Sequence, residues 1–373
     1  MKHLTKFLIA VFFLGMTGLT RAEVSYFKPS SKTGASLCVV VKDDVLAHTS
    51  QILPLNIKGG MITSTGVGDQ TALVLKNLDY LLKKVDSSLN KLVKLNIYVA
   101  REELVAEVQQ RLAKELELIA QPACTYVVTK LPDPKALVAL DAIAATDSSS
   151  KLTETKVFND APSGFRVALL PAGRTAYISG QAVKADTVSE AAIKTMKELF
   201  ETLEYLGAKP KNIVHIKAFM TPMSQANEVN EMIDGIFPEE RRPPVTLVEW
   251  FSSLPIEIEM IVAMPEAAPA SRPAETVTYK TPTGMKASPV YSRVAIAEVS
   301  DRIYVSGITS KEPGDYPTRI HSVFNQLQAI VGEAGSDMQH LAKATYYVSE
   351  DGISGDFGKI RTEYYNPKRP PAA

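Results

Sequence analysis

The stretch FPEERRPPVTLVEWFSSLPIEIEMIV, residues 237–262, decides the fold class. It predicts one strand, a short connection and a second strand, because an apolar run is followed by strict alternation. The second strand alternates three apolar side chains with two carboxylates: Ile256, Glu257, Ile258, Glu259 and Met260. Half-buried strands usually direct their charges toward solvent. A solvated face and a catalytic or binding cleft therefore both remain open for the two glutamates.

Strand-like segments of similar character recur at intervals of 121 and 128 residues: VKLNIYV (93–99), VHIKAFM (214–220) and AKATYYV (342–348). Each follows a segment whose apolar residues recur at helical spacing, which is typical of an amphipathic helix packed on a core. Strand signals at 176–181 and 303–308 precede the last two helices, and 46–51 is the divergent counterpart in the first repeat. The repeat predicts three α+β units, each with helices on one face of a mixed sheet.

The predicted division of the chain is a leader at 1–22, units at 24–145, 156–264 and 285–373, and a linker at 265–284. Residues 145–155 are polar and Ser/Thr-rich, and the linker is Pro/Ala-rich, so neither is expected to bury a core. Unit 3 stops at Ala373, before its last two strands. Because an open sheet edge is a liability, this favours a fragment of a longer chain over a unit that borrows or lacks its closing strands.

The first 22 residues have the layout of a secretory signal peptide. Lys2 and Lys6 precede an apolar run at 7–19, and small residues flank Arg21, which predicts cleavage after Ala22. The run is too short to span a bilayer comfortably. Without this segment 38 basic residues stand against 41 acidic ones, a formal charge of −3. We therefore expect an exported protein, periplasmic or secreted, with no membrane attachment after cleavage and no nucleic-acid partner.

The remaining chemistry is sparse. Cys38 and Cys124 allow either a disulfide or two separate buried thiols, since two cysteines do not make a disulfide framework. The histidines after the leader, His48, His215, His321 and His340, show no HExxH or comparable metal spacing. A glycine-rich phosphate loop is also missing from the sequence. We expect neither a metal nor a cofactor.

The order of elements and several short motifs resemble the RidA/YjgF family. These are small trimeric proteins, often called reactive intermediate deaminases and historically described as endoribonucleases of the L-PSP type. The matching motifs are YISGQ (177–181), MTPMSQANEVNEMIDGIF (220–237), LPIEIEMIVA (254–263) and SPVYSRVA (288–295). In these motifs Asn230, Glu259 and Tyr291 match the family's asparagine, functional glutamate and cleft tyrosine. The resemblance covers most of the mature chain and is weakest in unit 1.

The resemblance implies a chorismate-mutase-like fold with clefts between neighbouring subunits. In the family an arginine holds the carboxylate of a 2-imino or enamine acid, because its guanidinium matches a carboxylate as a fork. A glutamate positions the water that hydrolyses the imine to a 2-keto acid and ammonia. The resemblance therefore implies a catalytic role for Glu259, substrate binding by Asn230 and Tyr291, and a surface position for Glu257. Three covalently linked units would close the family's trimer as an intrachain pseudo-trimer, or else assemble with other chains as a homotrimer.

Four further residues belong to the candidate sites. A glycine within a strand permits close approach to the backbone, so Gly180 and Gly307 are candidate ligand-binding positions. Ser179 and Ser306 precede them and have no evident histidine and acid partners, which indicates backbone capping or cleft lining rather than nucleophilic catalysis. In unit 1 the position of the family glutamate is Asp141, which keeps the charge but shortens its reach.

The sequence departs from the family at the arginine. In units 1, 2 and 3 its place is taken by Cys124, Val245 and Ala373. None of these binds a carboxylate as a fork, and a lost charged hydrogen bond costs about 1.5–3 kcal/mol, or roughly ten- to more than a hundredfold in affinity. Arg241 and Arg242 either reach into the site from upstream or belong to a solvated turn.

Three functions remain open. The first is an imine or enamine hydrolase with an altered site, the second a non-catalytic module that binds a small metabolite, and the third an endoribonuclease-type activity. The acidic charge counts against the third, and the missing arginines count against the first for ordinary 2-imino acids. The expected partner in the first two cases is a small molecule.

Overall fold

The computed structural model describes residues 23–56, 58–63, 65–147, 152–161, 163–265, 273–348 and 353–373. The predicted leader at 1–22 lies outside the described residues, as do 148–151 and 266–272 of the two predicted linkers. Across the described ranges, no helix combines the length and the apolar character that crossing a membrane requires.

Unit 1 contains eight long elements: β1 (Glu23–Ser30), β2 (Ala35–Lys42), β3 (Leu46–Thr49), α1 (Val67–Lys83), β4 (Leu92–Val99), α2 (Val105–Leu116), β5 (Ala123–Val128) and β6 (Val138–Ala145). The helix α1 forms where apolar residues recur every three or four positions, and it buries Val74, Leu78 and Leu81. These side chains pack on the same core as the apolar face of β6.

Unit 2 repeats this order: β7 (Lys156–Asn159), β8 (Arg166–Leu170), β9 (Thr175–Gln181), α3 (Val188–Tyr205), β10 (Ile213–Met220), α4 (Ala226–Asp234), β11 (Val245–Glu249) and β12 (Ile256–Ala263). The helix α3 begins at a threonine cap, because the side chain of Thr187 accepts a hydrogen bond from the Glu190 amide. The strands predicted around residues 237–262 are β11 and β12, as the alternation indicates.

Unit 3 contains β13 (Val277–Lys280), β14 (Val294–Ala297), β15 (Arg302–Val305), α5 (Tyr316–Glu333) and α6 (Ser354–Tyr364). The strand predicted at 342–348 is wrong, since this segment makes only an isolated parallel bridge between Lys343 and Ala372. The reason lies in its neighbours: the equivalent strands β4 and β10 are hydrogen-bonded on both sides. The segment in unit 3 is bonded on one side only.

The opening hairpin of each unit pairs with the sheet of a neighbouring unit. Antiparallel ladders join β8 of unit 2 to β3 of unit 1, β14 of unit 3 to β9 of unit 2, and β2 of unit 1 to β15 of unit 3. The expectation that each unit forms its own sheet is wrong in this respect. The strand pattern did not reveal the exchange. A hairpin with alternating side chains has the same sequence pattern whether it pairs with a strand of its own unit or with a strand of a neighbouring unit. The three ladders close a cycle within one chain.

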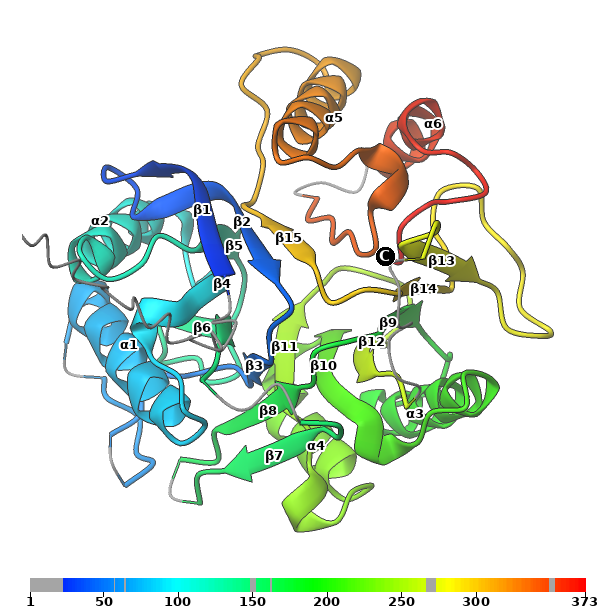
Figure 1. Ribbon diagram of the computed structural model, residues 1–373. Coiled ribbons are helices and arrows are strands. Elements are labelled where there is room, and N and C mark those ends of the chain that lie inside the picture. The colour runs from blue at the N-terminus through cyan, green and yellow to red at the C-terminus, as the bar shows by residue number, and fades with distance from the viewer. Residues whose placement is uncertain are drawn as a thin grey trace, which may run out of the picture.

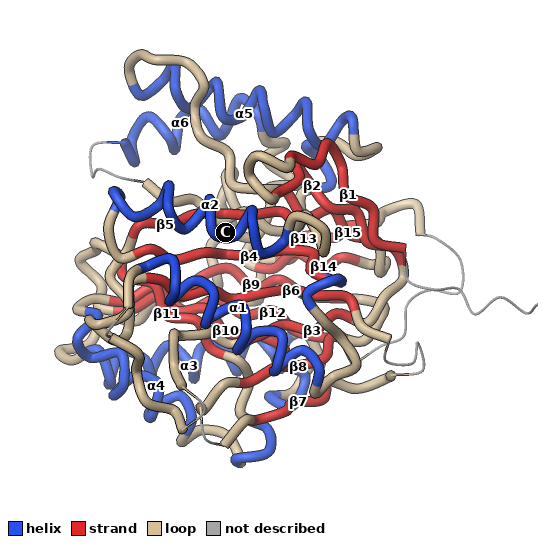
Figure 2. The backbone as a smooth tube through the Cα atoms, turned by 90° about the vertical axis from the view of Figure 1, so that its left-hand side faces the viewer, coloured by secondary structure: helices blue, strands red, loops and turns tan. Residues whose placement is uncertain are grey.

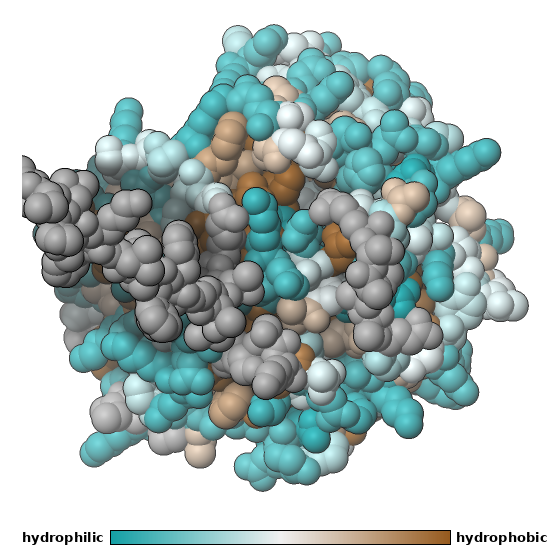
Figure 3. Space-filling view, in the orientation of Figure 1, coloured by the Kyte–Doolittle hydropathy of each residue, from teal (hydrophilic) through white to brown (hydrophobic). Residues whose placement is uncertain are grey.

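Exchanged strands contribute to the cores of the units that receive them. Val167 and Leu169 of β8 lie in the core of unit 1, and Val294 and Ile296 of β14 lie in that of unit 2. The helices form the outer layer, and the helix-free faces of the sheets meet at the centre (Figures 1 and 2). In Figure 3 polar side chains cover most of the outer rim, while hydrophobic ones gather near the middle of that face. The helices on the outer faces of mixed sheets confirm the prediction of an α+β fold.

The two cysteines do not form a disulfide. Cys38 on β2 and Cys124 on β5 are both buried and free, so the structure contains the separate thiols that the sequence left open. Burial raises the pKa of Cys124 to about 12, although the nearby Lys94 opposes the shift. Neither thiol is therefore an ionised nucleophile at neutral pH.

The cyclic exchange predicts a monomer in solution. Because each hairpin already has its partner within the chain, light scattering should give a mass at or just below the 40.6 kDa of the whole chain. Linked units associate at effective concentrations that reach about millimolar, so dilution should not change this mass. A stable assembly three times as heavy would show that the units trimerise between chains instead.

Candidate functional site

Each boundary between neighbouring units, called a seam below, is closed by an equivalent backbone hydrogen bond. The three bonds run from Gly180 N to Ala373 O at 2.9 Å, from Gly307 N to Cys124 O at 2.8 Å, and from Gln51 N to Val245 O at 3.0 Å. The acceptors are the three residues at the position of the family arginine. That position therefore lies against the strand of the neighbouring unit in every seam.

The two candidate serines reinforce these seams. The Ser179 hydroxyl accepts a hydrogen bond from the Ala373 amide at 2.9 Å and donates one to the carbonyl of Ser292. The Ser306 hydroxyl accepts one from the Cys124 amide at 2.8 Å and donates to Ser36 O at 2.6 Å. Both hydroxyls thus bind backbone groups of a neighbouring unit. This arrangement leaves them no catalytic base.

The seam between units 2 and 3 contains four of the eight predicted site residues: Ser179, Gly180, Glu259 and Tyr291. A Cβ atom at Gly180 would lie 2.2 Å from Oε1 of Glu257, so only glycine lets this carboxyl group lie against the strand. Tyr291 directly precedes Ser292, which bonds to Ser179, and the guanidinium of Arg293 lies 5.1 Å from the centroid of the Tyr291 ring.

The position of Glu257 contradicts the expectation of a surface residue. The side chain is half-buried, because the helix-free face of β12 packs against neighbouring units rather than against solvent. Burial and the nearby Glu259 raise the pKa of Glu257, and Lys343 opposes this shift. In unit 1 the equivalent residue is Ala139. It pairs with Tyr98 on β4, as Glu257 pairs with Phe219 on β10. Alternation along β12 was the signal that both glutamates share one face.

Glu259 lies at the same seam but is paired differently from Glu257. It is 8% exposed and forms an ion pair with Lys343 of unit 3. Asn230, which was expected beside it, lies on α4. That helix packs on the opposite face of β12, in one core with Ile258 and Met260. The structure therefore places Glu259 between units, as expected, but does not bring Asn230 to it.

Asp141 is the centre of a buried network at the seam between units 1 and 2. It accepts hydrogen bonds from its own unit, Asn96 at 2.7 Å and Tyr98 at 2.6 Å, and from Thr246 of unit 2 at 3.1 Å. Nζ of Lys217 lies 3.8 Å from the carboxylate. Burial alone would raise the pKa of Asp141, but Lys217, a nearby histidine and these hydrogen bonds together lower it.

Two buried histidines accompany this network. Burial lowers the pKa of His48 to about 3 and that of His215 to about 4, so both rings are neutral at pH 7. Nε2 of His215 lies 3.1 Å from the hydroxyl of Thr246. Among the residues that the structure describes, no group of three or more His, Cys, Asp or Glu side chains is placed to hold a metal ion.

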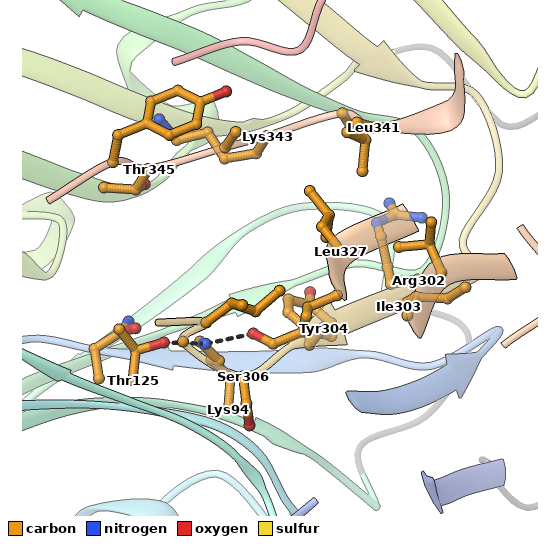
Figure 4. A pocket seen from close by; sticks show the side chains of 18 of the residues that line it. Lys94, Thr125, Arg302, Ile303, Tyr304, Ser306, Leu327, Leu341, Lys343 and Thr345 are labelled. Atoms are coloured by element: carbon orange, nitrogen blue, oxygen red, sulfur yellow. Dashed lines mark hydrogen bonds between the residues drawn. The ribbon is translucent and has the colours of Figure 1, made fainter. Parts of the chain in front are cut away.

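A cavity of about 1410 Å³ lies between unit 3 and the inner faces of units 1 and 2. Figure 4 shows β15 on one side of it and the segment with Leu341, Lys343 and Thr345 on the other. Charged side chains that sequence reasoning missed line this cavity: Lys94, Lys217, Arg302 and Lys343. The signal for three of them was available, because each strand-like repeat carries one lysine among apolar residues.

Three other candidates are Gly307 and the arginines Arg241 and Arg242. Gly307 lines the cavity, and a Cβ atom there would lie 3.1 Å from Thr125. Arg241 is exposed and Arg242 is half-buried. Neither arginine is among the described residues that line the cavity. They therefore do not replace the family arginine there.

These features define a pseudo-trimeric α+β protein whose candidate ligand sites lie between its units. The sequence model of the family described as Endoribonuclease L-PSP matches residues 31–146 and 160–264, which together are more than half of the chain. The chain therefore belongs to the Endoribonuclease L-PSP family, which is the RidA/YjgF family. The matched segments correspond to units 1 and 2, so the expectation that unit 1 resembles the family least is wrong, since the family model matches nearly its full length.

Solved structures of single-unit proteins are similar to about a third of the chain. A YjgF-family protein from Neisseria meningitidis is 20% identical over 34% of this chain and 98% of its own, with a TM-score of 0.24. A Rid-family protein from Yersinia pestis is 21% identical over 33% of this chain and 98% of its own, with a TM-score of 0.29. A comparison with curated proteins gave no significant match.

The Asp141 network predicts a stability loss on Asp141→Asn. Removing one partner of a buried ion pair leaves Lys217 poorly compensated and should cost about 3 kcal/mol. Because the pKa of Asp141 is lowered on folding, its contribution is present above the unfolded value near 3.9 and is lost as the pH falls through the folded value. Denaturation of wild type and variant between pH 2 and 7 should therefore converge at low pH.

A matched control is Glu190→Gln, which removes the exposed ion pair with Lys194 on α3. Solvent screens such pairs, so this variant should unfold as the wild type does. Equal stability of wild type and the Asp141 variant at pH 7 would contradict the role assigned to the network.

Proposed function

We propose that the protein is an exported RidA/YjgF-type protein that hydrolyses imine or enamine forms of small carboxylic acids at the seam between units 2 and 3. The observation that carries this proposal is the Glu257 carboxyl group held over Gly180, beside Ser179 and Ala373 and next to the segment that bears Tyr291. Export is supported by the leader that the sequence predicts. In the proposed reaction water adds to the imine carbon, the carbon–nitrogen bond breaks, and an oxo acid and ammonia leave.

Glu257 supplies the proton transfers in this proposal, in place of Glu259, to which the family resemblance gave the catalytic role and which forms an ion pair with Lys343. A carboxylate with a raised pKa is a better base than an ordinary one when it removes a proton from water, and its larger protonated fraction near neutral pH makes a proton available for the leaving nitrogen. Glycine at position 180 leaves the room in which the Glu257 carboxyl group lies against the strand. Among the described residues this seam combines the glutamate with the glycine: unit 1 has Ala139 and Gln51 at these positions, and the third seam has Gly307 but no described strand equivalent to β12.

The substrate carboxylate needs a cation, and the lysine at this seam, Lys343, is already paired with Glu259, so a substrate carboxylate would compete with Glu259 for it. Lys343 lies beside Glu259, lines the cavity and belongs to the same seam. A lysine is a point charge rather than a fork, so it orients a carboxylate less strictly than arginine. We therefore infer weak turnover of ordinary 2-imino acids. A non-catalytic metabolite-binding module is the second candidate, and Ala373 at the arginine position is the observation that favours it.

Ammonia release tests the proposal. Imines are generated in place from several amino acids by an amino-acid oxidase, and ammonia is followed with the protein, with Glu257→Gln and without protein. We expect a weak rate that Glu257→Gln abolishes. Ala373→Arg should raise the rate about tenfold or more, because it adds a charged hydrogen-bond donor at the seam that contains Glu257.

Val245→Arg is the matched control, since Val245 bonds to Gln51 at a different seam. If the arginine position alone determined activity, restoring an arginine in any unit would raise the rate of ammonia release. We expect Val245→Arg to leave that rate unchanged, because Val245 lies at a seam without Glu257. If Glu257→Gln leaves the rate unchanged, or if no variant exceeds the rate without protein, the hydrolase proposal is wrong. Ligand binding without turnover would then favour the second candidate.

A further inference from the structure

A short turn of unit 1 contacts unit 3 where the β2–β15 ladder ends. Val41 and Arg302 form the last pair of that ladder near the end of β2, and residues 43–45 then lead the chain into β3 (Figure 1). The carboxylate of Asp43 accepts a hydrogen bond from the hydroxyl of Ser300 in unit 3 at 2.8 Å. This turn therefore holds one end of the seam between units 3 and 1.

The backbone of the turn is strained. Asp43 has a φ of 45°, which lies in the left-handed region that aspartate adopts more readily than most residues but still at a cost. The side chain of Asp43 is exposed, and so is its hydrogen bond with Ser300. An exposed contact of this kind persists only while the neighbouring residues keep the turn in place.

The next residue, Asp44, is buried without a partner for one of its oxygens. Only 8% of Asp44 is exposed, and within the described ranges its Oδ2 atom has no hydrogen-bond partner. Burying an ionised carboxylate is unfavourable unless the charge is paired. Burial therefore raises the pKa of Asp44 to about 7, although a hydrogen bond from the Val45 backbone and the charge of Lys91 oppose the shift.

Two further carboxylates act on Asp44. Asp147, two residues after β6, and Asp43 in the same turn both raise its pKa. The cation that opposes them is Lys91, the residue before β4, and it forms an ion pair with Asp147. An ionised Asp44 would thus be repelled by two neighbours, while the attraction of Lys91 is shared with one of them.

The equivalent turn of unit 2 shows that the fold does not require a buried carboxyl group here. The carbonyls of Val45 and Arg174 accept equivalent hydrogen bonds from the residues that follow β6 and β12. Gly173 therefore stands where unit 1 has Asp44. The buried carboxyl group belongs to the contact between units 1 and 3 and not to the shape of the turn.

The turn of unit 2 also contacts unit 3, but through a charged pair. Nε of Arg174 lies 2.6 Å from the carboxylate of Glu298, and both side chains are 12% exposed. Burial alone would raise the pKa of Glu298, but its hydrogen bonds with Arg174 and Thr278 lower it. This pair therefore stays charged at neutral pH. The two equivalent turns should respond differently to pH.

We propose that Asp43, Asp44 and Ser300 form a pH-sensitive latch on the seam between units 3 and 1. The latch is closed while Asp44 keeps its proton. When Asp44 loses this proton to solvent, repulsion and the cost of burial favour a conformation in which its carboxylate reaches water. Because Asp43 directly precedes Asp44, the same movement withdraws Asp43 from Ser300. This inference goes beyond the proposed hydrolase and uses none of its residues.

The pH window of the latch follows from the proton affinities of its two states. Asp44 has a pKa of about 7 in the closed latch and about 3.9 when it is solvated. Between these values the open latch releases a proton that the closed latch keeps. Opening should therefore become about tenfold more favourable with each pH unit and level off above about pH 7. The penalty on the closed latch is absent below the solvated value and fully present above the buried one.

Hydrogen exchange on the full chain tests the latch. Protection of the amides of residues 43–46 and 300–302, corrected for the intrinsic exchange rate, should fall about tenfold or more between pH 5 and 7. In Asp44→Asn, which keeps the shape and removes the titrating group, this fall should disappear. Residues 172–175 in the equivalent turn are the internal reference, and their protection should not depend on pH in either protein.

A second variant and a control accompany this measurement. Asp44→Gly copies the turn of unit 2 and should also remove the pH dependence, so it decides the matter if Asp44→Asn does not fold. Asp69→Asn, at an exposed position of α1, should keep it. Chemical denaturation gives an independent readout: the difference in midpoint between Asp44→Asn and wild type should grow from pH 4 to 7 and stay level above.

Three results would overturn the proposal: protection at the turn that does not change with pH, the same change in the Asp44 variants as in wild type, or an equal loss at residues 172–175, which would indicate opening of the whole ring. The readout is independent of ammonia release. Glu257→Gln should abolish turnover and leave the pH dependence of the latch unchanged, so the failure of one proposal is distinguishable from the failure of the other.

Discussion

The pairing of each opening hairpin with the sheet of a neighbouring unit is the constraint on which the rest of the structure depends. It determines which strand edges meet, and it places residues of β8 and β14 in the cores of units 1 and 2. Because the exchange is cyclic, the helix-free faces are forced to the centre, where polar side chains must find partners across the seams. The position of every candidate site residue on these faces follows from that arrangement.

The charged interior shows how the chain meets this requirement. Asp141 and Glu259 stand at equivalent places on β6 and β12, yet one is held by a lysine, an asparagine, a tyrosine and a threonine, and the other by Lys343. Such pairs contribute less to stability than to specificity, because desolvation offsets much of their attraction. Different partners at each seam also mean that the three seams are chemically unequal.

Most of the fold was predictable from the sequence, because alternation and helical spacing report burial directly. The strands around Glu257 and Glu259, the helices and the threefold repeat are examples. Two features were not predictable. The hairpin exchange depends on long-range pairing that leaves the local pattern unchanged, and residues 342–348 have a strand-like pattern but lack the neighbour that would make them a strand.

The site was only partly predictable, for a related reason. Motif matching located Gly180, Ser179 and Tyr291, and it gave the functional role to Glu259 and a surface position to Glu257, although alternation places both glutamates on one face. The surface position given to Glu257 failed because the sheet face that would be solvated in a single unit is an interface here. The role of Lys343 depends on which unit lies across its seam. That information exists only in three dimensions.

The ladder between β2 and β15 has a consequence for the order of biosynthesis. Val41 pairs with Arg302, so β2 waits for a partner that is synthesised after the whole of units 1 and 2. Long sequence separation between paired strands slows folding and prolongs the exposure of unpaired edges. The ring therefore closes only after β15 has emerged. A chaperone that shields the first hairpin until then would prevent an exposure of strand edges that follows from the order of the strands alone.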